Sequence, residues 1–129
     1  MQPIFEPMLK LDTTFGHCDE LRLEVRDANL SANVQYFRTA GTFTRSFSFE
    51  FVEAHSLYLE PMLSDTARNC VDELCEVLHS EWSARWEKRA PPGLSRFHHY
   101  AIFFTKCGLL EVLCRHVTIG AEVRGMLTT

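Results

Sequence analysis

Apolar and polar residues alternate along several stretches of this chain, a pattern that predicts half-buried β-strands. Residues 20–26 place three apolar side chains on one face of a predicted strand, and residues 32–36 repeat the alternation after a predicted turn. The clearest alternation covers residues 42–51, where phenylalanine occupies four odd-numbered positions and Thr or Ser occupies most even-numbered ones. We therefore expect the phenylalanine face to be buried against a helix, a second sheet or a second subunit.

Residues 64–89 show a longer period, which predicts an amphipathic helix. Ser64 and Asp65 are residue types that cap helix N-termini, and the Pro-Pro-Gly segment at 91–93 ends the pattern. Between these signals, apolar residues recur at spacings of three and four: Ala67, Cys70, Val71, Leu74, Leu78, Trp82 and Trp86. The spacing predicts one helix of about six turns, with its apolar stripe packed on the phenylalanine face.

Strand patterns return after this helix. Residues 97–104 and 109–114 predict a hairpin with a glycine turn, and residues 57–59 predict a short strand before the helix. Residues 1–18 carry two prolines and predict an extended N-terminal arm. The expected fold is a single α+β domain over residues 1–129, with a mainly antiparallel sheet of five or six strands and one long amphipathic helix packed on a face. Because one helix covers only part of such a sheet, a homodimer would cover the remaining aromatic surface.

Composition and charge narrow the classes of partner. The chain is 46% hydrophobic and 23% charged, which is typical of a globular domain. Its formal net charge is −4 and its basic stretches are interrupted by Glu, so we expect no nucleic-acid partner. No apolar run approaches the roughly 20 residues that span a bilayer, so we expect no membrane partner either. A net negative domain is suited to a basic protein surface.

The five cysteines are an odd number without a disulfide framework, and residues 1–11 do not have the pattern of a signal peptide. We therefore expect a cytoplasmic protein with free thiols. The cysteines and histidines lack the close-spaced pairs of a zinc site, and the half-motif Glu76-x-x-His79 lies off the apolar stripe of the predicted helix. No nucleophile motif accompanies any cysteine, so we expect no metal, no cofactor and no catalytic residue.

Trp86 is a candidate for a contact surface because arginines flank it near the end of the predicted helix; packing on the sheet is the alternative. The acidic candidates for contact with a basic partner lie on the first strand and turn and around the Phe-rich strand: Asp19, Glu20, Glu24, Asp27, Glu50, Glu53 and Glu60. For each carboxylate, a solvated sheet face is the alternative.

Residues 47–114 resemble small bacterial immunity proteins of polymorphic toxin systems and related uncharacterised families. The resemblance is carried by the strand at 49–57, the helix with Trp82, and the segments 99–103 and 108–113. It implies a cytosolic, non-enzymatic α+β protein that binds and blocks a partner toxin. The family has no catalytic residues to carry over to this chain.

These observations favour a non-enzymatic protein-binding module, with immunity-type inhibition as its sharpest form. One alternative is a small-molecule-binding or enzymatic domain with a pocket between helix and sheet, where His99 and Tyr100 would lie. The other alternative is a homo-oligomeric structural protein.

Overall fold

Ten strands and two short helices are present among residues 2–13, 18–59, 64–89 and 96–128, which the computed structural model describes. In chain order they are β1 (Ile4–Lys10), β2 (Cys18–Arg26), β3 (Asn29–Arg38), β4 (Gly41–Glu50), β5 (Ala54–Tyr58), α1 (Asp65–Asn69), β6 (Glu73–Leu78), α2 (Glu81–Arg89), β7 (His98–Phe104), β8 (Gly108–Cys114), β9 (His116–Ile119) and β10 (Val123–Arg124). All the strand pairs are antiparallel.

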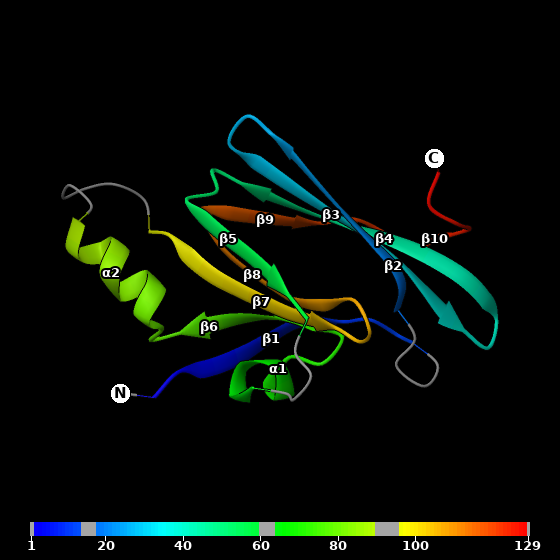
Figure 1. Ribbon diagram of the computed structural model, residues 1–129, viewed down its shortest axis with the longest axis horizontal. Coiled ribbons are helices and arrows are strands. Elements are labelled where there is room, and N and C mark those ends of the chain that lie inside the picture. Colours follow the sequence, from blue (N-terminus) through cyan, green and yellow to red (C-terminus); the bar gives the residue numbers. More distant parts are fainter. Residues whose placement is uncertain (1, 14–17, 60–63, 90–95, 129) are drawn as a thin grey trace.

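The strands form two sheets. Sheet A has the order β1-β6-β7-β8-β5, and sheet B has the order β10-β4-β3-β2, with β9 also paired to β4. Figure 1 shows the two sheets face to face, with α1 on the side of sheet A that faces away from sheet B and α2 beyond one end of sheet A. Neither helix in the described part of the chain has the length and apolar character needed to cross a membrane.

The phenylalanine face of β4 lies between the two sheets. Phe47 and Phe49 are 0% and 1% exposed, and their rings lie 6.2 Å from the rings of Phe104 and Tyr100 on β7. Burial of one such side chain contributes roughly 1.5–3 kcal/mol. The antiparallel pairing and the burial of these phenylalanines are therefore confirmed, and their cover is a second sheet.

The prediction of an α+β fold with one long amphipathic helix is wrong, because residues 64–89 form α1, β6 and α2. The predicted start is correct: the hydroxyl of Ser64 accepts a hydrogen bond from the Ala67 amide at 3.2 Å. Asp72 and His79, however, have φ values of 50° and 60°. These left-handed values are incompatible with one continuous right-handed helix, and α1 has already ended at Cys70, which has φ −135° and ψ 38°.

The spacing of apolar residues in this segment predicted a helix instead of a strand because β6 is covered on both faces. Leu74 joins the core between the two sheets, whereas Cys75 and Val77 join a second cluster on the outer face of sheet A. A strand that buries both faces loses the simple alternation of a half-buried strand. Its apolar residues then fall at intervals that also fit one face of a helix.

Two pairs of strands pass from one sheet to the other at the same corner of the molecule. The Arg115 amide donates to the Glu50 carbonyl at 3.1 Å, and the Glu53 amide donates to the Leu113 carbonyl at 2.8 Å. Phe51 lies at this corner with φ 53° and is 55% exposed. The buried alternation of β4 therefore ends before Phe51, which was expected to share the buried face.

Asp72 joins three segments at the other end of the sandwich. Its carboxylate accepts hydrogen bonds from the Thr105 amide and hydroxyl, both at 2.9 Å, and from the Cys18 thiol at 3.3 Å and the Thr13 hydroxyl at 3.5 Å. The residue is 4% exposed. These bonds tie the β7–β8 turn and the start of β2 to the segment that leaves α1.

Candidate functional site

The helix α2 is attached to the sandwich by two aromatic contacts. It begins after Ser80, whose hydroxyl accepts a hydrogen bond from the Ser83 amide at 3.1 Å, and none of its nine residues, all of them described, is buried. Trp82 stacks on His99 at 5.0 Å, and Trp86 packs on Phe97 at 4.2 Å between ring centroids. The apolar side chains of α2 therefore lie on the edge of the fold and leave surface on both flanks of the helix.

His99, the platform for Trp82, belongs to a hydrogen-bonded chain across sheet A. Its Nε2 lies 2.9 Å from the Glu111 carboxylate, and the Tyr58 hydroxyl donates to the other carboxylate oxygen at 2.9 Å. Burial alone would raise the pKa of Glu111, but the hydrogen bonds from His99 and Tyr58 outweigh burial and lower this pKa. An ionised carboxylate can only accept hydrogen bonds, so Nε2 of His99 carries the proton of its bond to Glu111.

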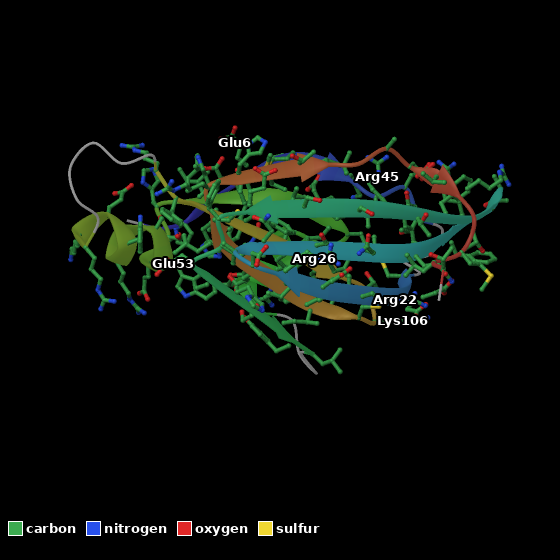
Figure 2. The ribbon with its side chains drawn as sticks, turned by 90° about the horizontal axis from the view of Figure 1, so that it is seen from above. Glu6, Arg22, Arg26, Arg45, Glu53 and Lys106 are labelled. Atoms are coloured by element: carbon green, nitrogen blue, oxygen red, sulfur yellow. The ribbon has the colours of Figure 1, made fainter. Side chains whose placement is uncertain are left out.

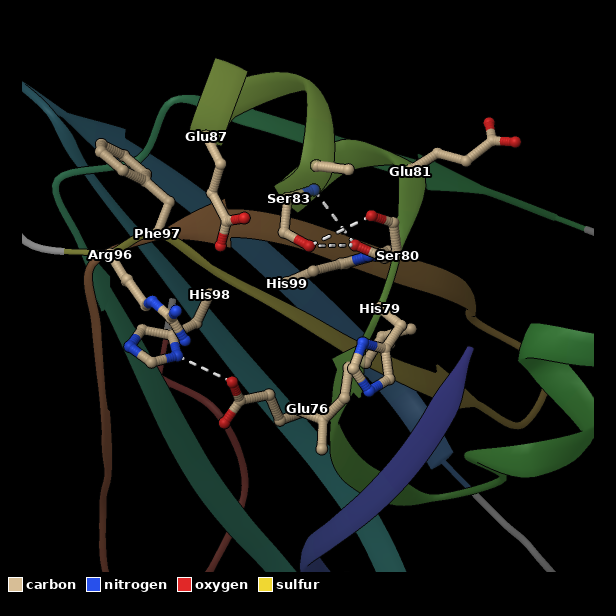
Figure 3. Close-up of a pocket in the computed structure, with 13 residues that line it drawn as sticks. Glu76, His79, Ser80, Glu81, Ser83, Glu87, Arg96, Phe97, His98 and His99 are labelled. Atoms are coloured by element: carbon tan, nitrogen blue, oxygen red, sulfur yellow. Dashed lines mark hydrogen bonds and ion pairs between the residues drawn. The ribbon is translucent and has the colours of Figure 1, made fainter. Parts of the chain in front are cut away.

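One flank of α2 forms a cleft of about 790 Å³ where β6 and β7 separate. The two strands are paired at Cys75 with Ala101 and at Glu76 with Tyr100, and their described residues diverge beyond Glu76. On its wall, His98 Nδ1 lies 2.7 Å from the Glu76 carboxylate. Figure 3 shows this pair, with Glu87 pointing from α2 toward the cleft.

Among the described residues that line it, the cleft holds acid and base groups but no positioned nucleophile. The hydroxyls of Ser80 and Ser83 lie 2.9 Å apart and cap α2. His98 and His99 are each paired with a carboxylate rather than with a hydroxyl or thiol in the described part of the chain. No group of three His, Cys, Asp or Glu among the described residues is placed to hold a metal ion.

His99 and Tyr100 point to opposite faces of sheet A. Tyr100 lies in the core beside Phe49, and burial raises its pKa well above the ordinary value. His99 lies on the outer face under Trp82. The two side chains therefore do not line one pocket together.

The other flank of α2 forms a smaller groove of about 220 Å³ against the crossing strands β5 and β8. It is lined by Glu53, Ala54, Trp82, Arg85, Trp86, Arg89 and Leu113. The four α2 residues recur at helical spacing, so they share the face of the helix that meets the sheet. Two predicted contact residues, Glu53 and Trp86, are thus brought together. Figure 2 shows Glu53 at the end of the sandwich that carries α2.

The predicted carboxylates of β2 lie elsewhere and are paired with arginines of the same strand. Glu20 lies 3.2 Å from Arg22, and Glu24 lies 3.4 Å from Arg26. Figure 2 shows Arg22 on β2 away from Glu53, whereas the turn that follows Arg26 is hydrogen-bonded to Val52 through Ala28. The outer face of β2 is therefore of mixed charge rather than acidic.

The remaining acidic candidates do not gather at the groove either. Asp19 is exposed at the start of β2, and Asp27 occupies the β2–β3 turn with φ 56°. Glu50 is half-buried at the end of β4. Glu60 lies outside the described residues.

Sequence reasoning missed an aromatic stack beside the groove. The guanidinium of Arg115 lies 5.3 Å from the ring of Phe97 and 5.4 Å from the ring of Phe51. Phe97 also contacts Trp86, so the stack continues onto α2. These residues meet through tertiary contacts between distant segments, and the sequence carries no local signal for them. The basic face of α2 was detectable from the spacing of Arg85 and Arg89 with the two tryptophans.

None of the five cysteines, all of which are described, forms a disulfide, and four of them are buried. Burial raises the pKa of Cys75 to about 11 and that of Cys114 to about 12. Burial and then the nearby Asp72 carboxylate raise the pKa of Cys18 still further. A thiolate is the reactive form of cysteine, so these thiols are poor nucleophiles at neutral pH.

No protein-family model, curated protein or solved structure matches this chain. The function therefore rests on the residues themselves.

Proposed function

We propose that this protein is a non-enzymatic protein-binding module that contacts its partner through the groove of α2 and the neighbouring strand β5. We call this region the α2–β5 surface and define it by Glu53, Leu57, Tyr58, Arg85, Trp86 and Arg89. It combines aromatic, aliphatic and charged side chains, as many protein interfaces do.

The observation that carries the proposal is the concentration of exposed apolar side chains between Phe51 and Leu59. Phe51, Leu57, Tyr58 and Leu59 are 55%, 41%, 42% and 73% exposed. Large apolar side chains exposed singly are normal, but a run of them along an edge strand, whose first residue Ala54 lines the groove with Trp86 and two arginines, favours a contact surface. Trp, Tyr and Arg are also the residues that most often dominate binding energy.

Immunity-type inhibition is the sharpest form of this proposal. The resemblance of residues 47–114 to immunity proteins supports it, and so does a contact surface without a positioned nucleophile in the described part of the chain. In this form the partner is a toxin that is blocked when bound.

A capture experiment with matched variants tests the proposal. The immobilised protein is exposed to a lysate of its source organism at low and high salt, and retained proteins are identified. We expect Trp86→Ala and Leu57→Lys to reduce retention of the specific partner at least tenfold. Val25→Lys is the matched control, because Val25 is an apolar edge-strand residue that is 61% exposed on β2.

The cleft beside β6 and β7 favours a second candidate function, the binding of a small molecule, because of its volume of about 790 Å³ and its His98–Glu76 pair. A thermal-shift screen of metabolites separates the two functions. A metabolite that raises the melting temperature by several degrees, together with no retained protein, would replace the protein-binding proposal. A partner retained equally by all three variants would place the contact surface elsewhere.

A further inference from the structure

We propose that β5 receives an extended segment of the partner as an added β-strand, and that Arg85 and Arg89 bind a carboxylate carried by that segment. This inference rests on the proposed function and names the chemistry of the partner.

Among the described strands, β5 is the sheet edge that lacks protection against pairing. The other edge of sheet A, β1, contains Pro7 and a bulge between Pro7 and Leu9. In sheet B, β2 alternates acidic and basic residues, and the β9–β10 edge is interrupted at Gly120. Prolines, bulges, charges, breaks and very short strands are the usual means of preventing edge pairing, and the five-residue sequence AHSLY of β5 contains none of the first four.

An exposed edge presents backbone amide and carbonyl groups in the spacing of a strand. A helix cannot pair with this row, whereas an extended chain can. Leu57 and Tyr58 are exposed and adjacent, so they lie on opposite faces of β5. An added strand would therefore cover apolar surface on both faces. Five paired residues correspond to a segment of about 17 Å.

One end of the added strand would lie beside α2. Charge complementarity with the arginines there favours an acidic side chain at that end. Ala54, the first residue of β5, lines the groove together with Arg85 and Arg89. The ion pair of Arg85 with Glu81 is 3.3 Å long, with side chains 68% and 88% exposed, so it offers little resistance to a competing carboxylate. A residue of the added strand near Ala54 would reach both guanidinium groups, which are suited to bind Asp or Glu.

The effect of Glu53 on binding affinity depends on the charge of the partner segment. Glu53 lines the same groove as the two arginines, so its negative charge repels an incoming carboxylate. Removal of the Glu53 charge should strengthen the binding of an acidic segment. If the partner segment were basic, the same substitution would weaken binding.

The test uses three soluble peptides of seven alternating Thr and Val residues, with Glu, Gln or Lys at both ends. Binding is measured by fluorescence anisotropy, and amide hydrogen exchange of residues 54–58 reports strand pairing. We expect the Glu peptide to bind at least fivefold more tightly than the Gln peptide and to slow exchange in β5. The double variant Arg85→Gln/Arg89→Gln should abolish this preference, and Glu53→Gln should tighten binding of the Glu peptide about two- to fivefold.

Arg26→Gln and Glu24→Gln are the matched charge controls on β2, where the side chains are 82% and 63% exposed, and they should change nothing. Equal binding of the Glu and Lys peptides would overturn the carboxylate assignment. Failure of every peptide to bind, while the protein still captures a partner through Trp86, would overturn strand addition and leave the proposed function intact. A native dimer that dissociates with Leu57→Lys but not with Val25→Lys would also overturn the inference, because a second copy would then occupy β5.

Discussion

The helices α1 and α2 differ in a way that their lengths do not suggest. The helix α1 has five residues, yet Ala67 and the following Cys70 are fully buried against Ala101 and Phe103 of β7. Backbone bonds also fasten its exit, since the Phe103 amide donates to the Cys70 carbonyl at 2.9 Å. A helix this short is not stable in isolation, so α1 depends on its tertiary contacts.

The helix α2 is nearly twice as long and is attached much less. None of its residues is buried, and Trp82 and Trp86 connect it to His99 and Phe97. Segments with few buried contacts open at a lower free energy than the core. Depth of packing, rather than helix length, therefore distinguishes α1 from α2 and leaves the surface of α2 exposed.

A matched pair of substitutions, one in each helix, tests whether α1 is packed more deeply than α2, and it has the largest expected effect. Ala67 is 0% exposed, so Ala67→Asp would bury a carboxylate among apolar side chains and should lower the free energy of unfolding by about 3–5 kcal/mol. Ala84 is exposed on α2, so Ala84→Asp should change it by less than about 0.5 kcal/mol. Urea denaturation measures both values.

If Ala67→Asp does not fold, Ala67→Ser provides a milder version, with an expected loss of about 1–3 kcal/mol. Similar losses at positions 67 and 84 would show that the two helices are equally integrated.

The aromatic contacts of α2 should contribute less to the free energy of unfolding than the packing of α1 does. Trp86→Ala removes the ring contact with Phe97 and part of a half-buried surface, and should lower the free energy of unfolding by about 1–2 kcal/mol. Amide exchange in α2 should become faster, whereas exchange of the Phe103 amide should not change. Phe37→Ala, which alters a 46% exposed ring on β3, is the control. Faster exchange at Phe103 would show that α2 supports the whole sandwich.

The smallest expected effect is the pH dependence of the free energy of unfolding that Glu111 contributes through its contact with His99. The folded-state pKa of Glu111 is lowered from the ordinary 4.5, so its ionised form stabilises the fold above about pH 4.5, and this contribution is lost as the pH falls through the folded-state pKa. The difference in unfolding free energy between the wild type and Glu111→Gln should therefore be larger at pH 7 than at pH 3. Glu24→Gln, at an exposed pair, should show a much weaker trend. An equal difference at both pH values would contradict the role assigned to the hydrogen bonds from His99 and Tyr58.

The candidate site could be predicted in part. Trp86 and its neighbouring arginines follow from helical spacing alone, and Glu53 was predicted from its place beside the Phe-rich strand. The carboxylates of β2 were grouped with Glu53 because they share a charge, but their pairing with Arg22 and Arg26 and their distance from α2 depend on how the two sheets are stacked. The stack of Phe51, Arg115 and Phe97 had no signal in any one segment.

By itself, the sequence determined the strands with one buried and one polar face, such as β2 and β4, because their alternation records burial residue by residue. It also determined the cap at Ser64 and the end of α2, since capping chemistry is local. Only the tertiary structure decided the secondary structure of residues 73–78. Their apolar side chains fit a helix or a doubly buried strand equally well, and the cover on both faces comes from segments distant in the chain. The exposure of β5 was decided in the same way, because the order of strands in sheet A places it at an edge.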